Sequence, residues 1–167
     1  MLALKVEHFE SNGLLRSSFS CYDHGFGAQQ TIRLEESRHL NIEKLMKMDQ
    51  VEITLANCCL SNLDINLFLK HWIDNGGSPR LRLLKIAFIS RQVFRMDETL
   101  RSLKKYMVNS DETPKEYVSL RAEDPRHSTN RARYRTTPNQ ELRRPDGGTV
   151  IVSWDNELTL LFFPPKP

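Results

Sequence analysis

The clearest pattern of hydrophobic and polar positions lies over residues 61–88, and it predicts a helix followed by a strand. Apolar side chains recur at the i, i+3, i+4, i+7 and i+8 positions of one helix face: Ile65, Phe68, Leu69, Trp72 and Ile73. Ser61 before this run and Asp64 three residues later predict a capping box in the first turn. Gly76 predicts the end of the helix, because glycine readily adopts the left-handed conformation, and Pro79 prevents the helix from resuming.

Two short segments on either side of this helix alternate between apolar and polar residues, as half-buried strands do. Their apolar positions are Val51, Ile53 and Leu55 before the helix and Leu84, Ile86 and Phe88 after it. A strand, a helix and a second strand in this order indicate a crossover between parallel strands. The helix–strand pair over Leu40–Leu55 resembles a shorter version of the same unit. We therefore expect an α/β fold of leucine-rich-repeat-like strand–helix units with a parallel sheet, although repeat arrays usually need about three units or more.

The C-terminal part of the chain, residues 140–164, predicts an antiparallel β-meander. Three β-rich runs are separated by the turn residues of Pro145–Gly148 and of Asp155–Asn156, and Pro164 ends the last run. The fold class expected from the sequence is therefore α/β, with a parallel sheet followed by this meander.

The other segments are less regular, and 167 residues fit a single domain over residues 1–167. Residues 1–30 form a poorly readable N-terminal segment with no sustained pattern. Lys115–Leu120 predicts a weak strand. Residues 122–138 contain two prolines and few large apolar side chains, so we expect a long, basic, exposed loop there.

Positive charge is concentrated in one part of the sequence. The formal net charge of the chain is +3. Residues 121–144 contain seven arginines and three acidic residues, so the rest of the chain is close to neutral. Such weak overall basicity does not by itself indicate a nucleic-acid partner. No apolar stretch reaches the length of a membrane-spanning helix, so we expect no membrane partner.

Three cysteines, Cys21, Cys58 and Cys59, predict neither a disulfide framework nor a zinc site. Their number is odd, and no pair has the spacing of zinc ligands. Free thiols favour a reducing compartment, and the first residues lack the apolar run of a secretory signal. We therefore expect an intracellular protein, cytoplasmic or nuclear.

The candidate catalytic residues lack partners in the sequence. Cys58 and Cys59 have no histidine or glycine elbow nearby, and His71 has no nucleophile or carboxylate placed to work with it. The segment Asp23–Gly27 indicates a turn rather than a phosphate loop or a metal site. Trp72 lies on the apolar stripe, so we expect it to pack in the core. We predict no enzyme, and no catalytic, metal-binding or cofactor-binding residues.

Residues 126–137 form the segment with the strongest binding interpretation. Its arginines are interleaved with an aromatic ring, a composition that suits phosphates, RNA or an acidic peptide. The candidate partner-binding residues are Arg131, Arg133, Tyr134 and Arg135. A nucleic-acid-binding protein using this segment is the alternative function, and a solvated loop without a partner is the structural alternative. Phosphorylation of Ser128, Thr129 or Thr136 would cancel the positive charge.

Two blocks of sequence together carry a family resemblance. The first is LNIEKLMKM, VEITLANCCLSN, LDINLFLKHWIDNGG and SPRLRLLKIAF over Leu40–Phe88, and the second is ELRRPDGGTVIVSW with the apolar strand after it, over Glu141–Pro164. In this order they resemble the F-box-associated domain, type 2, of nematode F-box proteins. The resemblance extends from Met1 through Pro165.

The resemblance implies a substrate-binding module. In such proteins an N-terminal F-box docks on the adaptor of a cullin-based ubiquitin ligase, and the associated domain captures the target. Nothing before Leu40 reads as the leucine- and proline-rich hairpin of an F-box. A Skp-family adaptor and a cullin are therefore expected partners only if a longer form supplies an F-box. The implied function is protein–protein recognition, as the substrate-binding domain of an SCF-type ubiquitin ligase receptor.

Overall fold

The computed structural model describes residues 8–11, 30–89, 93–108, 115–122, 131–136 and 140–165. Cys21 and the turn predicted over Asp23–Gly27 lie outside these residues, as does most of the N-terminal segment 1–30. Ser128 and Thr129, the first two candidate phosphorylation sites, also lie outside them.

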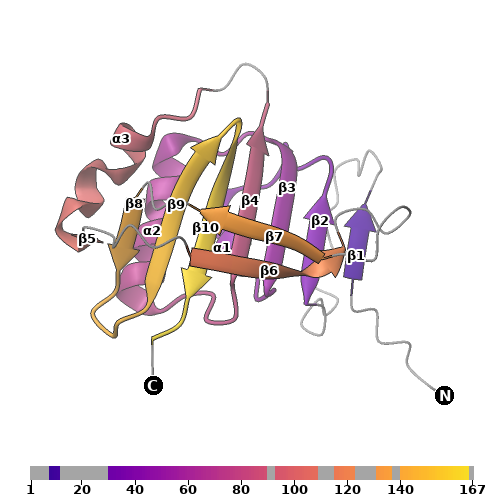
Figure 1. Cartoon of the computed structure of the whole chain (residues 1–167). Helices are drawn as coiled ribbons and strands as arrows, with labels where there is room; N and C mark the ends of the chain where they lie inside the picture. Colours follow the sequence, from indigo (N-terminus) through magenta and orange to yellow (C-terminus); the bar gives the residue numbers. More distant parts are fainter. Residues whose placement is uncertain are drawn as a thin grey trace.

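The described residues contain a sheet of eight strands (Figure 1). Its spatial order is β1 (His8–Ser11), β2 (Thr31–Leu34), β3 (Glu52–Cys58), β4 (Leu83–Phe88), β10 (Glu157–Phe163), β9 (Thr149–Asp155), β8 (Gln140–Arg143) and β5 (Met107–Val108). The first four strands are parallel. The pairings from β4 through β5 are antiparallel. The predicted parallel strands and the predicted meander β8–β9–β10 are both confirmed, and they share one sheet because β10 pairs with β4.

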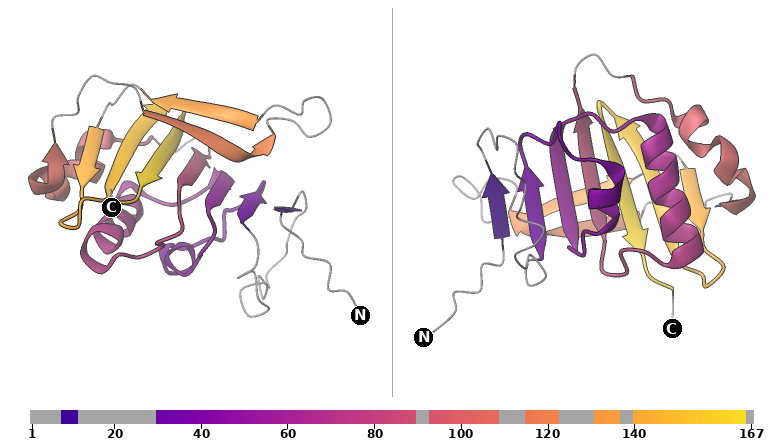
Figure 2. Two further views of the ribbon diagram at one scale, coloured as in Figure 1. Left: turned by 60° about the horizontal axis from the view of Figure 1, so that its bottom comes forward. Right: turned by 180° about the vertical axis from the view of Figure 1, so that it is seen from behind.

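Helices cover one face of the sheet, and a two-stranded ribbon crosses the other (Figure 2). α1 (Ile42–Met46) and α2 (Asn62–Asn75) connect the parallel strands and lie on the same face. α3 (Met96–Leu100) and the 3-10 helix η3 (Arg101–Tyr106) pack beside α2. β6 (Lys115–Ala122) and β7 (Arg131–Thr136) pair with each other to form the ribbon on the opposite face. Among the described residues, two strand–helix–strand units, β2–α1–β3 and β3–α2–β4, precede the antiparallel strands of the sheet.

Helix α2 begins and ends where the sequence predicts. The Ser61 side chain accepts a hydrogen bond from the Asp64 backbone N–H at 3.2 Å, and the Asp64 carboxylate accepts one from the Ser61 N–H at 2.7 Å. These two bonds satisfy donors that the first turn of a helix leaves without partners. Gly76 follows the last helical residue with φ of 64°, in the left-handed region that favours glycine.

The main hydrophobic core lies between the sheet and the helices. Ile53 and Leu55 of β3 contribute to it, together with the apolar stripe of α2. Trp72 is only 4% exposed, and its ring centroid lies 5.2 Å from that of Phe162 in β10. The prediction that Trp72 packs in the core is therefore confirmed.

A second, smaller hydrophobic cluster lies beneath the ribbon. Leu83, Ile151 and Leu161 are its buried members, and Tyr117 of β6 and Tyr134 of β7 pack against them. Both faces of the central strands are therefore covered, one by α1 and α2 and the other by the ribbon. This second cluster explains why β9 and β10 are apolar along most of their length rather than strictly alternating.

The ribbon corrects the prediction for residues 122–138. Six of these residues, Arg131–Thr136, form strand β7 rather than an exposed loop. The segment has little apolar periodicity of its own, and it is a strand because its backbone pairs with β6. Residues 123–130 and 137–138 lie outside the described part of the chain.

Candidate functional site

The candidate residues Arg131, Arg133, Tyr134 and Arg135 all lie on β7. Arg133 is exposed, and its Nη1 lies 3.0 Å from a carboxylate oxygen of Glu116 on β6. Tyr134 is half-buried in the cluster beneath the ribbon, and burial raises the pKa of its hydroxyl. The side chains of Arg131 and Arg135 lie outside the described atoms. The structure therefore brings the four residues onto one strand, but it gives the Tyr134 ring a packing role.

A buried carboxylate fastens the ribbon to the sheet. Glu52 of β3 is 4% exposed, and it accepts hydrogen bonds from the Tyr117 hydroxyl at 2.8 Å, the Ser119 hydroxyl at 2.9 Å and the Leu120 backbone N–H at 2.6 Å. Burial, and then the hydrogen bond to Glu52, raise the pKa of Tyr117 far above its usual range. Sequence reasoning missed this contact, because Glu52 occupies a polar position of an alternating strand and its donors come from a distant segment.

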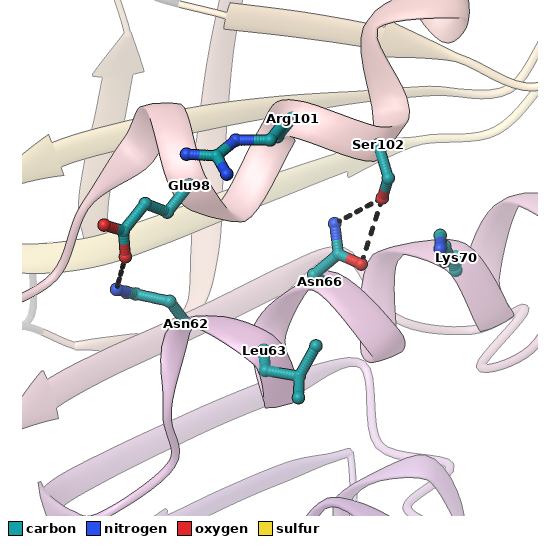
Figure 3. A pocket seen from close by; sticks show the side chains of 7 residues that line it. All are labelled: Asn62, Leu63, Asn66, Lys70, Glu98, Arg101 and Ser102. Carbon is teal, nitrogen blue, oxygen red and sulfur yellow. Dashed lines mark hydrogen bonds between the residues drawn. The ribbon is translucent and has the colours of Figure 1, made fainter.

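A groove of about 420 Å³ lies between α2 and the α3–η3 segment (Figure 3). We call it the α2–η3 groove. Asn62 and Asn66 line it from α2, and Glu98 and Ser102 line it from the facing elements. It is far from the ribbon, since α2 and β6–β7 lie on opposite faces of the sheet.

Polar side chains fix the two walls of the α2–η3 groove to each other. Asn62 Nδ2 donates to Glu98 Oε2 at 3.2 Å, and the Asn62 side-chain oxygen accepts from the Arg95 backbone N–H at 3.1 Å. One turn later, Asn66 donates to the Thr99 carbonyl and lies within hydrogen-bond distance of the Ser102 hydroxyl. The side-chain amides of Asn62 and Asn66 therefore have hydrogen-bond partners within the protein.

Apolar and positively charged side chains of α2 and η3 also lie in the groove or beside it. Leu63 is 67% exposed and Leu67, one turn along α2, is 41% exposed. Lys70 of α2 and Arg101 of η3 also line the groove (Figure 3). A leucine pair on the outer face of a helix is the sequence signal that would have indicated this site.

The described side chains show no arrangement that suits covalent chemistry. Cys58 is buried, and burial raises the pKa of its thiol, which disfavours the reactive thiolate. His71 is within 3.0 Å of the Asn75 side-chain nitrogen, on the same helix. In the described part of the chain, no group of three or more His, Cys, Asp or Glu side chains could hold a metal ion. No helix there combines the length and the apolar character needed to cross a membrane.

The two blocks of sequence that carry the family resemblance contact each other. The guanidinium carbon of Arg144, from the β8–β9 turn, lies 4.9 Å from the centroid of the Trp72 ring on α2. Arg144 also forms an ion pair with Asp146, and its guanidinium leaves little room for a side chain at Gly76. The arginine and glycine residues of these blocks are therefore used to join α2 to the meander.

The comparison with family models matched one family, described as F-box associated, over residues 25–86. The match spans β2, α1, β3, α2 and most of β4, and it includes the α2 wall of the groove. The block over Glu141–Pro164 lies outside the matched residues, and no F-box was found in the chain. A search of curated proteins found no match, and neither did a search of solved structures. Over residues 25–86, therefore, the chain is similar to the F-box associated family.

Proposed function

We propose that this chain is a protein–protein recognition module, the substrate-binding domain of an SCF-type ubiquitin ligase receptor. The observation that carries the proposal is the F-box associated match over residues 25–86. Domains of this family are typically non-catalytic binding modules. Ubiquitin transfer would take place on other subunits inside the cell and would need no residue of this chain.

The α2–η3 groove is the surface that we propose for target binding. It is open to solvent, its walls are fixed by Asn62 and Asn66, and the exposed Leu63 lines it. Exposed apolar side chains beside a cavity are typical of protein-interaction sites. Part of the groove comes from the residues that match the family, which ties this surface to the family's role in binding.

The exposed side of the ribbon is a second proposed contact for the same target. Arg133 is exposed there, and Arg131, Tyr134 and Arg135 of the same strand remain candidate partner-binding residues with it. The ion pair of Arg133 with Glu116 lowers the positive charge that this strand offers to a polyanion, so nucleic acid is a weaker proposal than an acidic protein surface.

A Skp-family adaptor and a cullin would join through an F-box carried by a longer form of this protein. Affinity purification of the longest expressed form should recover the adaptor, the cullin and at least one further protein. That further protein should accumulate when the proteasome is inhibited, because it is the ligase target. Recovery of neither adaptor nor cullin, with no protein stabilised on depletion of the receptor, would contradict the proposed function.

A further inference from the structure

We propose that the α2–η3 groove binds a short acidic segment of the target protein, in which Asp or Glu residues flank an apolar side chain. The carboxylates would contact Lys70 and Arg101, and the apolar side chain would pack on Leu63 and Leu67. This inference rests on the proposed function and names the chemical class of the target segment.

The charges at the groove favour an anionic occupant. In the part of the chain that the structure describes, Lys70 and Arg101 make no ion pair. Glu98, the acidic residue of the lining, is already paired with Arg95 at 2.9 Å and accepts from Asn62. The groove lining therefore holds two cations and one carboxylate that is already paired, and an opposing negative patch is electrostatically complementary to this net positive lining.

The identity of the cations and their positions favour carboxylates on a peptide. A guanidinium such as that of Arg101 matches the two oxygens of a carboxylate, and an ammonium such as that of Lys70 accepts a single oxygen from any direction. The two side chains come from different walls of the groove (Figure 3). A segment that contacts both must cross the groove, so we expect carboxylates at two separated positions rather than one.

The apolar part of the proposed segment follows from Leu63 and Leu67. Both lie on the outer face of α2, away from the core stripe, and remain well exposed. Leu63 also lines the groove, so an apolar side chain seated beside it would remove hydrophobic surface from water. An apolar side chain that is fully buried at the centre of such a contact contributes more to affinity than the solvated residues around it.

The fixed walls make the groove ready to bind. The hydrogen bonds of Asn62 and Asn66 hold α3–η3 against α2, so little ordering of the receptor is needed. A second copy of this chain is a less suitable occupant. In a two-fold interface the same patches face each other, and the unpaired cations of both copies would repel.

Selection of displayed random peptides on the whole chain tests this inference. Enriched peptides should combine Asp or Glu with Leu, Ile, Val or Phe, and labelled synthetic copies then serve as binding probes. Reversing both charges with Lys70→Glu and Arg101→Glu should weaken their affinity by about tenfold or more. Leu63→Asp should weaken it by a similar factor. Lys47→Glu combined with Arg80→Glu, which also reverses two charges at residues that do not line the groove, is the matched control and should leave it unchanged.

Circular dichroism and thermal unfolding of each variant show whether a loss of binding is caused by a loss of folding. These residues are at the surface, so all variants should unfold near the wild-type temperature. Enriched peptides without acidic residues, no enrichment, or affinities that the groove variants do not change would each overturn the inference.

The proposed function can fail separately from this inference. If the groove variants still capture the target in the affinity purification, the receptor function stands and the groove inference is wrong. If acidic peptides bind at the groove while no adaptor, cullin or degraded protein copurifies, the inference stands and the ligase function is wrong.

Discussion

A single buried carboxylate, that of Glu52, connects two of the three layers. Its oxygens are withdrawn from water, and a buried charge is tolerated only where hydrogen bonds replace the lost solvent. Tyr117, Ser119 and the backbone of Leu120 supply these bonds, all from β6. The position of the ribbon therefore depends in part on one side chain in β3, beside the packing of Tyr117 and Tyr134.

Replacing Glu52 with Ala should lower the free energy of unfolding by about 3 kcal/mol, because three donors of β6 lose their acceptor. Glu52→Gln, which keeps the shape and one acceptor oxygen, should cost less. Denaturant unfolding measures both. Glu116→Ala, at an exposed residue of the same strand, is the control and should cost less than about 1 kcal/mol. Equal losses for Glu52 and Glu116 would show that the buried bonds do not hold the ribbon.

The tyrosine that donates to Glu52 should make stability fall in alkali. In the folded protein, burial is the main cause that raises the pKa of Tyr117, and the hydrogen bond to Glu52 is the second. An unfolded tyrosine ionises at about pH 10. Its contribution is complete below that pH and is lost as the pH rises further, because only the unfolded state releases the proton. The stability difference between the wild type and Tyr117→Phe should therefore shrink above about pH 10. Unfolding titrations across this range measure the difference, and a constant value would contradict the raised pKa.

At the scale of secondary-structure elements, α2 connects the core, the groove and the meander. The apolar stripe on one side of α2 is buried in the core. Trp72, which belongs to this stripe, also makes a cation–π contact with Arg144 of the β8–β9 turn. The outer side of α2 carries Leu63 and Leu67, and its amides hold α3–η3. A change at the start of α2 should therefore affect both the stability of the fold and the shape of the groove.

Ser61→Ala should destabilise the protein by about 1 kcal/mol, since it removes the acceptor for the Asp64 N–H in the capping box. Asp64→Ala removes the reciprocal bond and should have a similar effect. Because the two residues form one unit, the double variant should lose less than the sum of the two single losses. Thermal or denaturant unfolding of all three variants provides the test, and strict additivity would contradict the reciprocal cap.

At the scale of the whole molecule, the strands differ in how many neighbouring strands and covering layers shield their backbone hydrogen bonds from water. β4, β9 and β10 lie inside the sheet and are covered on both faces, whereas β1 and β5 each pair with one strand. Among the described strands, β6 and β7 pair with each other alone. Local opening follows such differences in burial and pairing.

Hydrogen–deuterium exchange should therefore be slowest in β4, β9 and β10. The amides of the ribbon should exchange faster, by a route that opens without unfolding the sheet. Mass spectrometry of peptic fragments resolves these segments. In Glu52→Ala the ribbon should lose further protection, while β10 keeps its own. A ribbon as strongly protected as β10 in both proteins would contradict separate opening of this layer.

The local elements could be predicted from the sequence, and the long-range contacts could not. The helix over Asn62–Asn75 carries its cap, its stripe and its glycine end within one continuous segment. Strand β7 has no such local pattern. Its position comes from pairing with β6 and from the packing of Tyr134 against the sheet. The burial of Glu52 likewise depends on donors far along the chain. The α2–η3 groove forms where α2 packs against α3–η3, so it could not be predicted from either segment alone. The apolar Leu63 and Leu67 on the outer face of α2 are the sequence feature that would have indicated an exposed surface there.

The position of β10 between β4 and β9 has a consequence during synthesis. The ribosome delivers the N-terminal side of the chain first, at roughly 5–20 residues per second. Strand β4 is therefore made long before its partner, and its open edge waits until Glu157–Phe163 have left the exit tunnel. Throughout this interval the nascent chain presents the open edge of an apolar strand to chaperones and to neighbouring nascent chains. Slow codons after β4 would lengthen this exposure, so the yield of folded protein should depend on translation speed as well as on stability.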